Sequence, residues 1–142
     1  MKYFTLNELC RSNTAHHYGI KNKPDKQAIK NLNALVDQVL DPLRREFGKP
    51  IYVTSGYRCP ALNTLVVGAA FSQHMRGEAA DIRAQDMAAL TNLVIDMRSK
   101  GRLLADQIIL EKTRVIDGKQ VPIWIHISFV TRRENRNQLL IK

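Results

Sequence analysis

The chain has little cysteine and no long apolar run, and both absences restrict the kind of protein it can be. Its two cysteines, Cys10 and Cys59, do not form a C-x-x-C pair and are too few for a disulfide scaffold, so we expect free thiols. No apolar stretch approaches the length of a membrane span. The first residues also lack the apolar segment of a secretion signal, so we expect synthesis in the cytoplasm and retention there unless another factor releases the protein.

Acidic residues are scarce relative to basic ones. The sequence has 22 Lys and Arg against 13 Asp and Glu, which gives a formal net charge of +9 at pH 7. A basic surface favours anionic partners, among them nucleic acid, acidic lipid and anionic wall polymers. We expect no nucleic-acid partner, because the basic residues are spread along the chain and form no platform with aromatic residues for single strands.

The length and the order of the predicted elements indicate one α+β domain over residues 1–142. A chain of 142 residues, 44% of them hydrophobic, suits a single core. Pro24 and Asp25 begin a helix whose apolar residues recur at spacings of three and four up to Gly48, and Pro42 marks a point where it could kink. Short strands with turns follow, so we expect a small, mainly antiparallel sheet packed against helices.

The other predicted elements are short. A capping box at Thr5–Glu8 begins the first helix, and a polar loop with two exposed histidines follows over residues 12–23. Further strands are expected over residues 51–54, 79–83, 107–111 and 123–130, and further helices over residues 60–67 and 86–101. Asp117-Gly118 predicts a hairpin turn, and residues 131–142 are interpreted as a tail that is basic and polar until Leu139-Leu140-Ile141.

One stretch concentrates side chains that are suited to metal binding. Residues 72–81 follow the pattern S-x-H-x-x-G-x-A-x-D, in which His74 and Asp81 are seven positions apart. An imidazole nitrogen and a carboxylate oxygen are both good zinc ligands, and a catalytic zinc usually has three protein ligands and a water. Gly77 permits a tight bend between the two ligands.

The third ligand is expected from the last predicted strand. Alternate residues of a strand face opposite sides, so Trp124, His126 and Ser128 share one face, opposite a row of apolar residues. By the same parity, Asp81 and Glu111 point to the face that carries His126. For His126 alone, a hydrogen-bonded core histidine is the simpler interpretation, and the S-x-H-x-x-G-x-A-x-D motif favours a metal ligand instead.

The motif resembles the signature of the zinc D-Ala-D-Ala carboxypeptidase and L-alanyl-D-glutamate endopeptidase family, whose metal-site architecture is shared with the hedgehog signalling domain. Ser55–Arg58 resembles the S-G-Y-R segment of that family, and residues 106–111 and 124–129 resemble its C-terminal half. The arginine-rich tail from Thr131 is similar to that of small phage and prophage members. The resemblance covers residues 5–140 and implies a hedgehog-like α+β fold.

The resemblance implies a hydrolase that cleaves peptidoglycan stem peptides with one zinc ion per chain. His74, Asp81 and His126 would hold the zinc, and Arg58 would stabilise an oxyanion or bind a substrate carboxylate. The residues predicted to contact substrate are Ser72, Gln73, Trp124 and Ser128. The scissile bond, either D-Ala-D-Ala or L-Ala-D-Glu, stays open, and we expect a monomer.

The chain departs from the family at the general base. Many members carry an acid three residues before the last histidine, where this chain has Ile123. Glu111 is the predicted substitute, because it ends the neighbouring strand on the same face, and the alternative is a surface glutamate paired with Lys112 or Arg114. Without a base, the protein would be a catalytically impaired, zinc-containing wall-binding module. If a general base is present, the lack of a secretion segment fits a lysis enzyme that leaves the cytoplasm through a separate pore, as phage lysins do.

Overall fold

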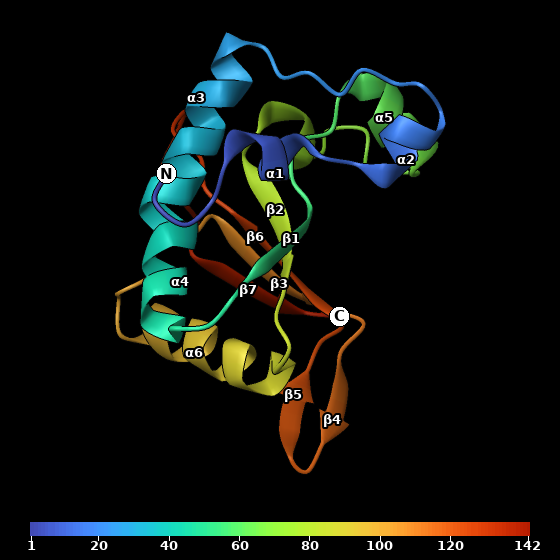
Figure 1. The fold of residues 1–142 in the computed structure, drawn as a ribbon. Coiled ribbons are helices and arrows are strands. Elements are labelled where there is room, and N and C mark those ends of the chain that lie inside the picture. Colours follow the sequence, from blue (N-terminus) through green and yellow to red (C-terminus); the bar gives the residue numbers. More distant parts are fainter.

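The computed structural model describes residues 1–142 and has an α+β architecture, as predicted (Figure 1). A sheet of five strands has the order β1-β2-β6-β3-β7. The strands are β1 (Tyr52–Ser55), β2 (Ala79–Arg83), β6 (Trp124–Ser128), β3 (Gln107–Glu111) and β7 (Gln138–Ile141). All neighbours pair antiparallel except β3 and β7, which run parallel. The sheet is therefore mainly antiparallel, in agreement with the sequence.

Strand β7 corrects the interpretation of residues 131–142 as a polar tail. The chain leaves β6, crosses the end of β3 and returns along the outer edge of the sheet, where Leu139 lies beside Ile108. Three consecutive apolar residues carry this strand, and four residues are too few to show a periodicity. The crossing segment, residues 129–137, brings the arginines of the tail to the sheet.

The long helix predicted from Pro24 to Gly48 is present but contains an irregular turn. It consists of α3 (Lys26–Leu35), a π-helical turn η1 (Val36–Leu40) and α4 (Asp41–Phe47). The backbone N–H of Asp41 donates to the carbonyl of Val36, five residues back. The next residue is Pro42, which has no N–H to donate, so the wider turn ends where the proline begins.

The shorter elements complete the molecule: α1 (Leu6–Cys10), α2 (Asn13–His17), α5 (Pro60–Leu65), the 3₁₀ turn η2 (Gln73–Arg76), α6 (Met87–Ser99), β4 (Arg114–Ile116) and β5 (Lys119–Val121). Helix α2 was expected to be loop, and it forms because the Ser12 hydroxyl accepts a hydrogen bond from the Ala15 N–H. The β4–β5 turn is confirmed: Asp117 and Gly118 both have positive φ, as a type I′ turn requires.

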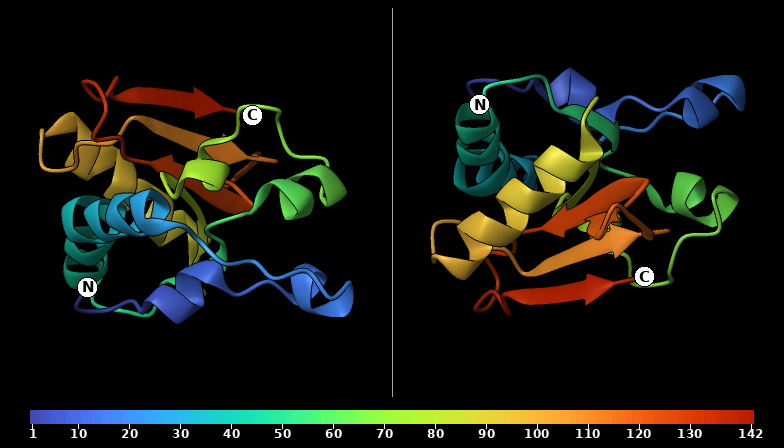
Figure 2. Two further views of the ribbon diagram at one scale, coloured as in Figure 1. Left: turned by 90° about the horizontal axis from the view of Figure 1, so that it is seen from above. Right: turned by 90° about the horizontal axis from the view of Figure 1, so that it is seen from below.

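The hydrophobic core lies between one face of the sheet and the helices α3, α4 and α6 (Figure 2). Ile125 of β6 pairs laterally with Ile82 and Leu110, and all three are fully buried. The predicted parity of β6 is thus confirmed, and the opposite face is left for polar side chains. Cys10 and Cys59 are free thiols, as predicted. None of the helices combines the length and the apolar character that a membrane crossing needs.

Candidate metal centre

Two of the predicted ligands lie side by side on the polar face of the sheet. In the antiparallel register, Asp81 of β2 pairs with His126 of β6, and His126 pairs on its other side with Ile109 of β3. Laterally paired residues point to the same face. The pairing of β2 with β6 therefore brings together two residues that are 45 positions apart.

The third residue, His74, reaches the same point from η2. The Ser72 hydroxyl accepts a hydrogen bond from the His74 N–H at 3.2 Å and caps this turn. Gly77 ends it with φ of +72°, and a Cβ at this position would lie 2.4 Å from the Ala28 carbonyl oxygen. Only glycine fits this close approach to α3, which explains the glycine of the motif.

The side chains of His74, Asp81 and His126 each offer one possible metal-ligand atom, and these three atoms lie within 4.8 Å of one another. Asp81 Oδ1 lies 3.3 Å from His74 Nε2 and 3.2 Å from His126 Nδ1. The two imidazole rings meet edge to face, with centroids 5.1 Å apart. One carboxylate oxygen and two ring nitrogens thus point at a common centre.

The protonation of His74 suits a metal ligand. Its Nδ1 lies 2.7 Å from the Gly56 carbonyl oxygen, and because a carbonyl only accepts, Nδ1 carries the hydrogen. In the neutral ring, Nε2 then presents a lone pair toward Asp81. A lone pair facing a carboxylate is unfavourable unless a cation lies between them, so these residues fit a bound metal ion.

The electrostatics keep both groups in their metal-binding forms. His74 is 3% exposed, and this burial lowers the pKa of its imidazole, which favours the neutral ring. Burial alone would raise the pKa of Asp81, but its hydrogen bond with the His126 ring outweighs that effect and holds the pKa well below its ordinary range. A neutral imidazole and a carboxylate are the forms that bind zinc.

Arg58 lies directly beside the three donors. Its Nη2 is 3.4 Å from Asp81 Oδ2, its Nε donates to Ser55 Oγ at 3.0 Å, and its Nη1 donates to Asn63 Oδ1 at 3.3 Å. Its own backbone N–H donates to the carbonyl of His74. The predicted S-G-Y-R segment therefore supports both sides of the centre, since Gly56 orients His74 while Arg58 contacts Asp81.

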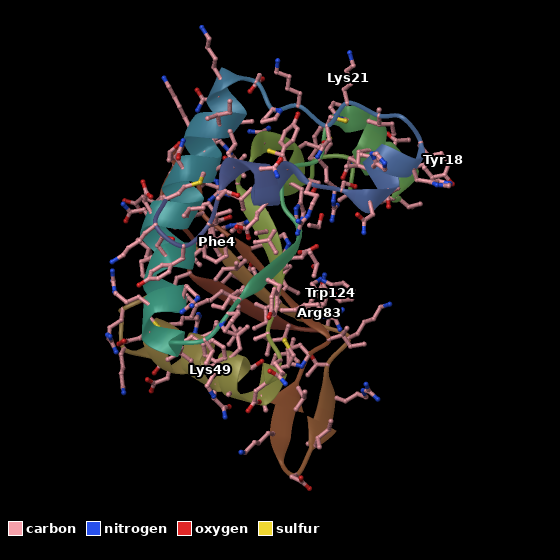
Figure 3. The ribbon with its side chains drawn as sticks, viewed as in Figure 1. Phe4, Tyr18, Lys21, Lys49, Arg83 and Trp124 are labelled. Atoms are coloured by element: carbon pink, nitrogen blue, oxygen red, sulfur yellow. The ribbon has the colours of Figure 1, made fainter.

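The donors line an open cavity of about 450 Å³. Of the other predicted site residues, Arg58, Gln73, Glu111 and Trp124 (Figure 3) also line it. Ser72 and Ser128 do not, because Ser72 caps η2 and Ser128 is fully buried, with its Oγ accepting from the Gln107 N–H. The cavity also includes residues that were not among the predicted site residues: Ala69, Phe71, Gln107, Ile109, Arg132, Arg133 and Arg136.

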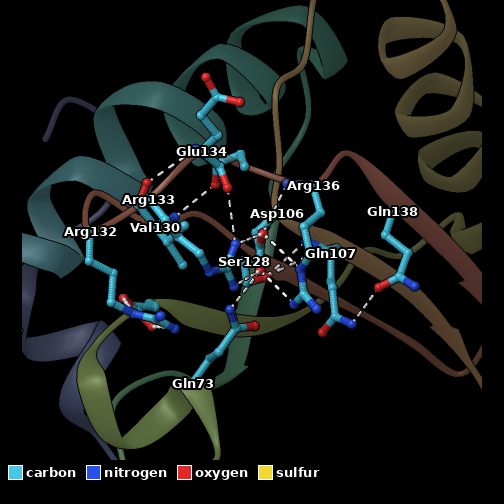
Figure 4. A network of polar contacts seen from close by, with 12 residues as sticks. Gln73, Asp106, Gln107, Ser128, Val130, Arg132, Arg133, Glu134, Arg136 and Gln138 are labelled. Carbon is cyan, nitrogen blue, oxygen red and sulfur yellow. Dashed lines mark hydrogen bonds and ion pairs between the residues drawn. The ribbon is translucent and has the colours of Figure 1, made fainter.

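A buried carboxylate beside the cavity was missed as well (Figure 4). Asp106 is fully buried and binds the side chains of Arg133, Arg136 and Gln73. Burial would raise its pKa, but these hydrogen bonds dominate and hold the pKa far below its ordinary range. In the sequence, Asp106 is a single acidic residue between an apolar segment and a strand, and its three partners are 27, 30 and 33 positions away.

An α+β fold with a His-Asp-His ligand set that lines an open cavity defines a candidate metal centre of the hydrolytic type. Residues 2–107 match the family model described as Peptidase M15, and the chain therefore belongs to this peptidase family. The match includes His74 and Asp81 and ends before His126, which pairs with Asp81 in the sheet. No curated protein matches the chain.

Proposed function

We propose that this protein is a zinc metallopeptidase that hydrolyses peptide bonds in peptidoglycan stem peptides. The observation that carries the proposal is the convergence of His74, Asp81 and His126 within 4.8 Å in a member of a peptidase family. The other two histidines, His16 and His17, are exposed on α2 and take no part in this cluster. One zinc ion per chain is the expected content.

The protein ligands leave room for a reacting water. Three protein ligands with an open fourth position are typical of catalytic zinc, which lowers the pKa of water and polarises carbonyl oxygens. The side chain of His74 is almost inaccessible, whereas those of Asp81 and His126 are 12% and 14% exposed. All three residues line the cavity, so a peptide that enters it would reach the metal centre.

We propose Glu111 as the general base that accepts a proton from the attacking water and passes it to the leaving amine. It lines the cavity and pairs laterally with Trp124, two positions along β3 from Ile109, which pairs with His126. No ion pair engages its carboxylate, and Lys112 instead lies over the Trp124 ring, 5.5 Å from its centroid. This arrangement favours the catalytic interpretation over a surface pair with Lys112.

Arg58 is suited to stabilise the charge that develops on the carbonyl oxygen. Its guanidinium is held by three side-chain partners. Burial lowers the pKa of this group, but arginine normally has so high a pKa that the side chain stays charged. A positive charge that is held in place before the reaction need not reorganise during it. Gln73 and Trp124 also line the cavity and are proposed to contact the peptide.

Mass spectrometry of a synthetic stem pentapeptide, L-Ala-γ-D-Glu-L-Lys-D-Ala-D-Ala, tests the proposal and identifies the bond. Loss of one alanine from the C-terminus would identify a D-Ala-D-Ala carboxypeptidase, and release of the N-terminal alanine would identify an L-Ala-D-Glu endopeptidase. Either activity should disappear with a chelator and return with zinc. A protein that binds zinc and the peptide but cleaves neither bond would be a wall-binding module instead.

A further inference from the structure

We propose that Arg133 and Arg136 form a carboxylate-binding subsite beside the metal centre, and that buried Asp106 positions both arginines for this role. The inference rests on the proposed function and deepens it, because it names a chemical group that a preferred substrate must carry. Both arginines lie beyond the residues that match the peptidase family.

Asp106 holds the two guanidinium groups in fixed positions. Its Oδ1 accepts from Arg133 Nη1 at 2.7 Å and from Arg136 Nε at 3.1 Å, and its Oδ2 accepts from Arg133 Nη2 at 3.1 Å and Arg136 Nη2 at 2.8 Å. The backbone N–H of Arg136 also donates to Oδ1. Two-point contacts of this kind fix a guanidinium in both position and plane.

Both arginines keep hydrogen-bond donors that Asp106 does not use. Their side chains are 35% and 49% exposed and line the same cavity as the metal donors. Asp106 and the contact of Arg133 with the Glu134 carbonyl leave Arg133 Nε and Arg136 Nη1 without a protein partner. A further carboxylate can therefore bind without displacing Asp106.

The charges around the cavity single out this pair. Asp106 supplies one negative charge against two arginines, so the cluster keeps a net positive charge. Arg132 is neutralised by buried Glu78, whose carboxylate accepts from it at 3.0 and 3.3 Å. Arg58 is engaged by Asp81 and two further side chains. The Arg133–Arg136 pair is thus the cationic group with most capacity left for an anion.

Gln73 connects this subsite to the metal centre. Its Nε2 donates to Asp106 Oδ2 at 2.8 Å, and it is the residue directly before His74. The two sites therefore share one rigid turn, η2, so a substrate carboxylate held by the arginines would set the position of the peptide relative to the metal donors.

A stem peptide offers two carboxylates that could bind here, the α-carboxylate of γ-linked D-Glu and the C-terminal carboxylate. Four forms of the same pentapeptide separate them: both groups free, either one amidated, or both amidated. Trp124 is the single tryptophan and lines the cavity, so its fluorescence after rapid mixing reports binding before turnover.

Amidation of the recognised carboxylate should weaken binding to the wild-type protein about tenfold or more, the usual effect of losing hydrogen bonds to a charged group. The position at which amidation matters identifies the carboxylate. Arg133→Gln and Arg136→Gln should each weaken binding of the free acid and leave binding of the corresponding amide nearly unchanged. Each single variant keeps one arginine on Asp106, so the buried carboxylate stays paired.

Arg45→Gln is the matched control, because it removes the same charge from an exposed position on α4. It should bind both peptide forms like the wild type. Equal binding of all four peptides by the wild-type protein would overturn the subsite while leaving the peptidase proposal standing, and so would equal losses for acid and amide in the arginine variants. Failure to bind any form would contradict the proposed function as a whole.

Discussion

The Nδ1 atom of His74 donates to the backbone carbonyl of Gly56 at 2.7 Å, and this contact sets which ring nitrogen can bind a metal. The acceptor belongs to the backbone, so no side-chain substitution at position 56 removes it directly. It depends instead on how closely the segment around Gly56 approaches α1, where the Tyr57 N–H donates to the Leu9 carbonyl at 2.7 Å. The orientation of His74, a proposed metal ligand, thus depends on the packing of the first helix.

Gly56→Ala should weaken metal binding without altering any ligand. A Cβ at this position would lie 2.1 Å from the Leu9 carbonyl oxygen, so the segment must move and carry the acceptor away from His74. Loss of such a supporting contact typically costs roughly tenfold to a hundredfold in metal affinity. Competition with a chromogenic zinc chelator measures this affinity.

Gly101→Ala is the control for this substitution. Gly101 has φ of +69° and open space around its Cβ position, so alanine there should cost about 1 kcal/mol of stability and leave zinc affinity unchanged. Wild-type affinity in Gly56→Ala would show that the contact with His74 does not support the metal centre.

Glu111→Gln should abolish most of the hydrolysis while keeping the zinc. The amide has nearly the same shape but cannot accept a proton from water, and general-base catalysis contributes roughly a hundredfold to ten-thousandfold in rate. Stem-peptide turnover and zinc content are measured on the same preparation. Glu46→Gln, on the exposed surface of α4, should retain the wild-type rate. A fully active Glu111→Gln variant would assign the base elsewhere.

Asp106→Asn should destabilise the protein strongly at neutral pH. It removes the negative charge between Arg133 and Arg136, and because both arginines are partly exposed, the expected loss is that of hydrogen bonds to a charged group, roughly 1.5–3 kcal/mol. Urea unfolding measures the loss. Asp117→Asn is the control, because Asp117 is exposed in a turn where asparagine is equally suitable.

The low pKa of Asp106 also predicts how the free energy of unfolding changes with pH. The folded-state pKa of Asp106 lies below the unfolded value of about 3.9. Its contribution is therefore complete above that unfolded value and is lost as the pH falls toward the folded pKa. The free energies of unfolding of the wild type and Asp106→Asn should differ most near neutral pH and converge in acid. A constant difference across the range would contradict this assignment.

The sequence predicted the fold well where residue patterns are local. The spacing of apolar residues revealed the long helix, Asp117-Gly118 revealed the turn, and the alternation around Ile125 gave the correct buried face. It failed at β7, because a parallel pairing with β3 depends on a partner far away in the chain. It also failed at α2, where a serine cap organises a segment that has no apolar periodicity.

The site shows the same division between local and distant information. The motif brought His74 and Asp81 together within ten residues, and strand parity indicated the face of His126, which the register places beside Asp81. Parity did not reveal that Ser128 is buried at the end of its strand. The cluster around Asp106 could not be predicted, because it joins three segments that are far apart in the sequence.

Zinc content per chain, measured by elemental analysis on untagged protein, tests the central claim most directly. The wild type should contain about one zinc, the site occupancy expected for a single three-ligand centre, and His126→Ala should lose it. His16→Ala removes an exposed histidine on α2 and should keep the wild-type content. A wild-type protein that holds no zinc even after the metal is added back, or a His126→Ala variant that retains it, would contradict the account.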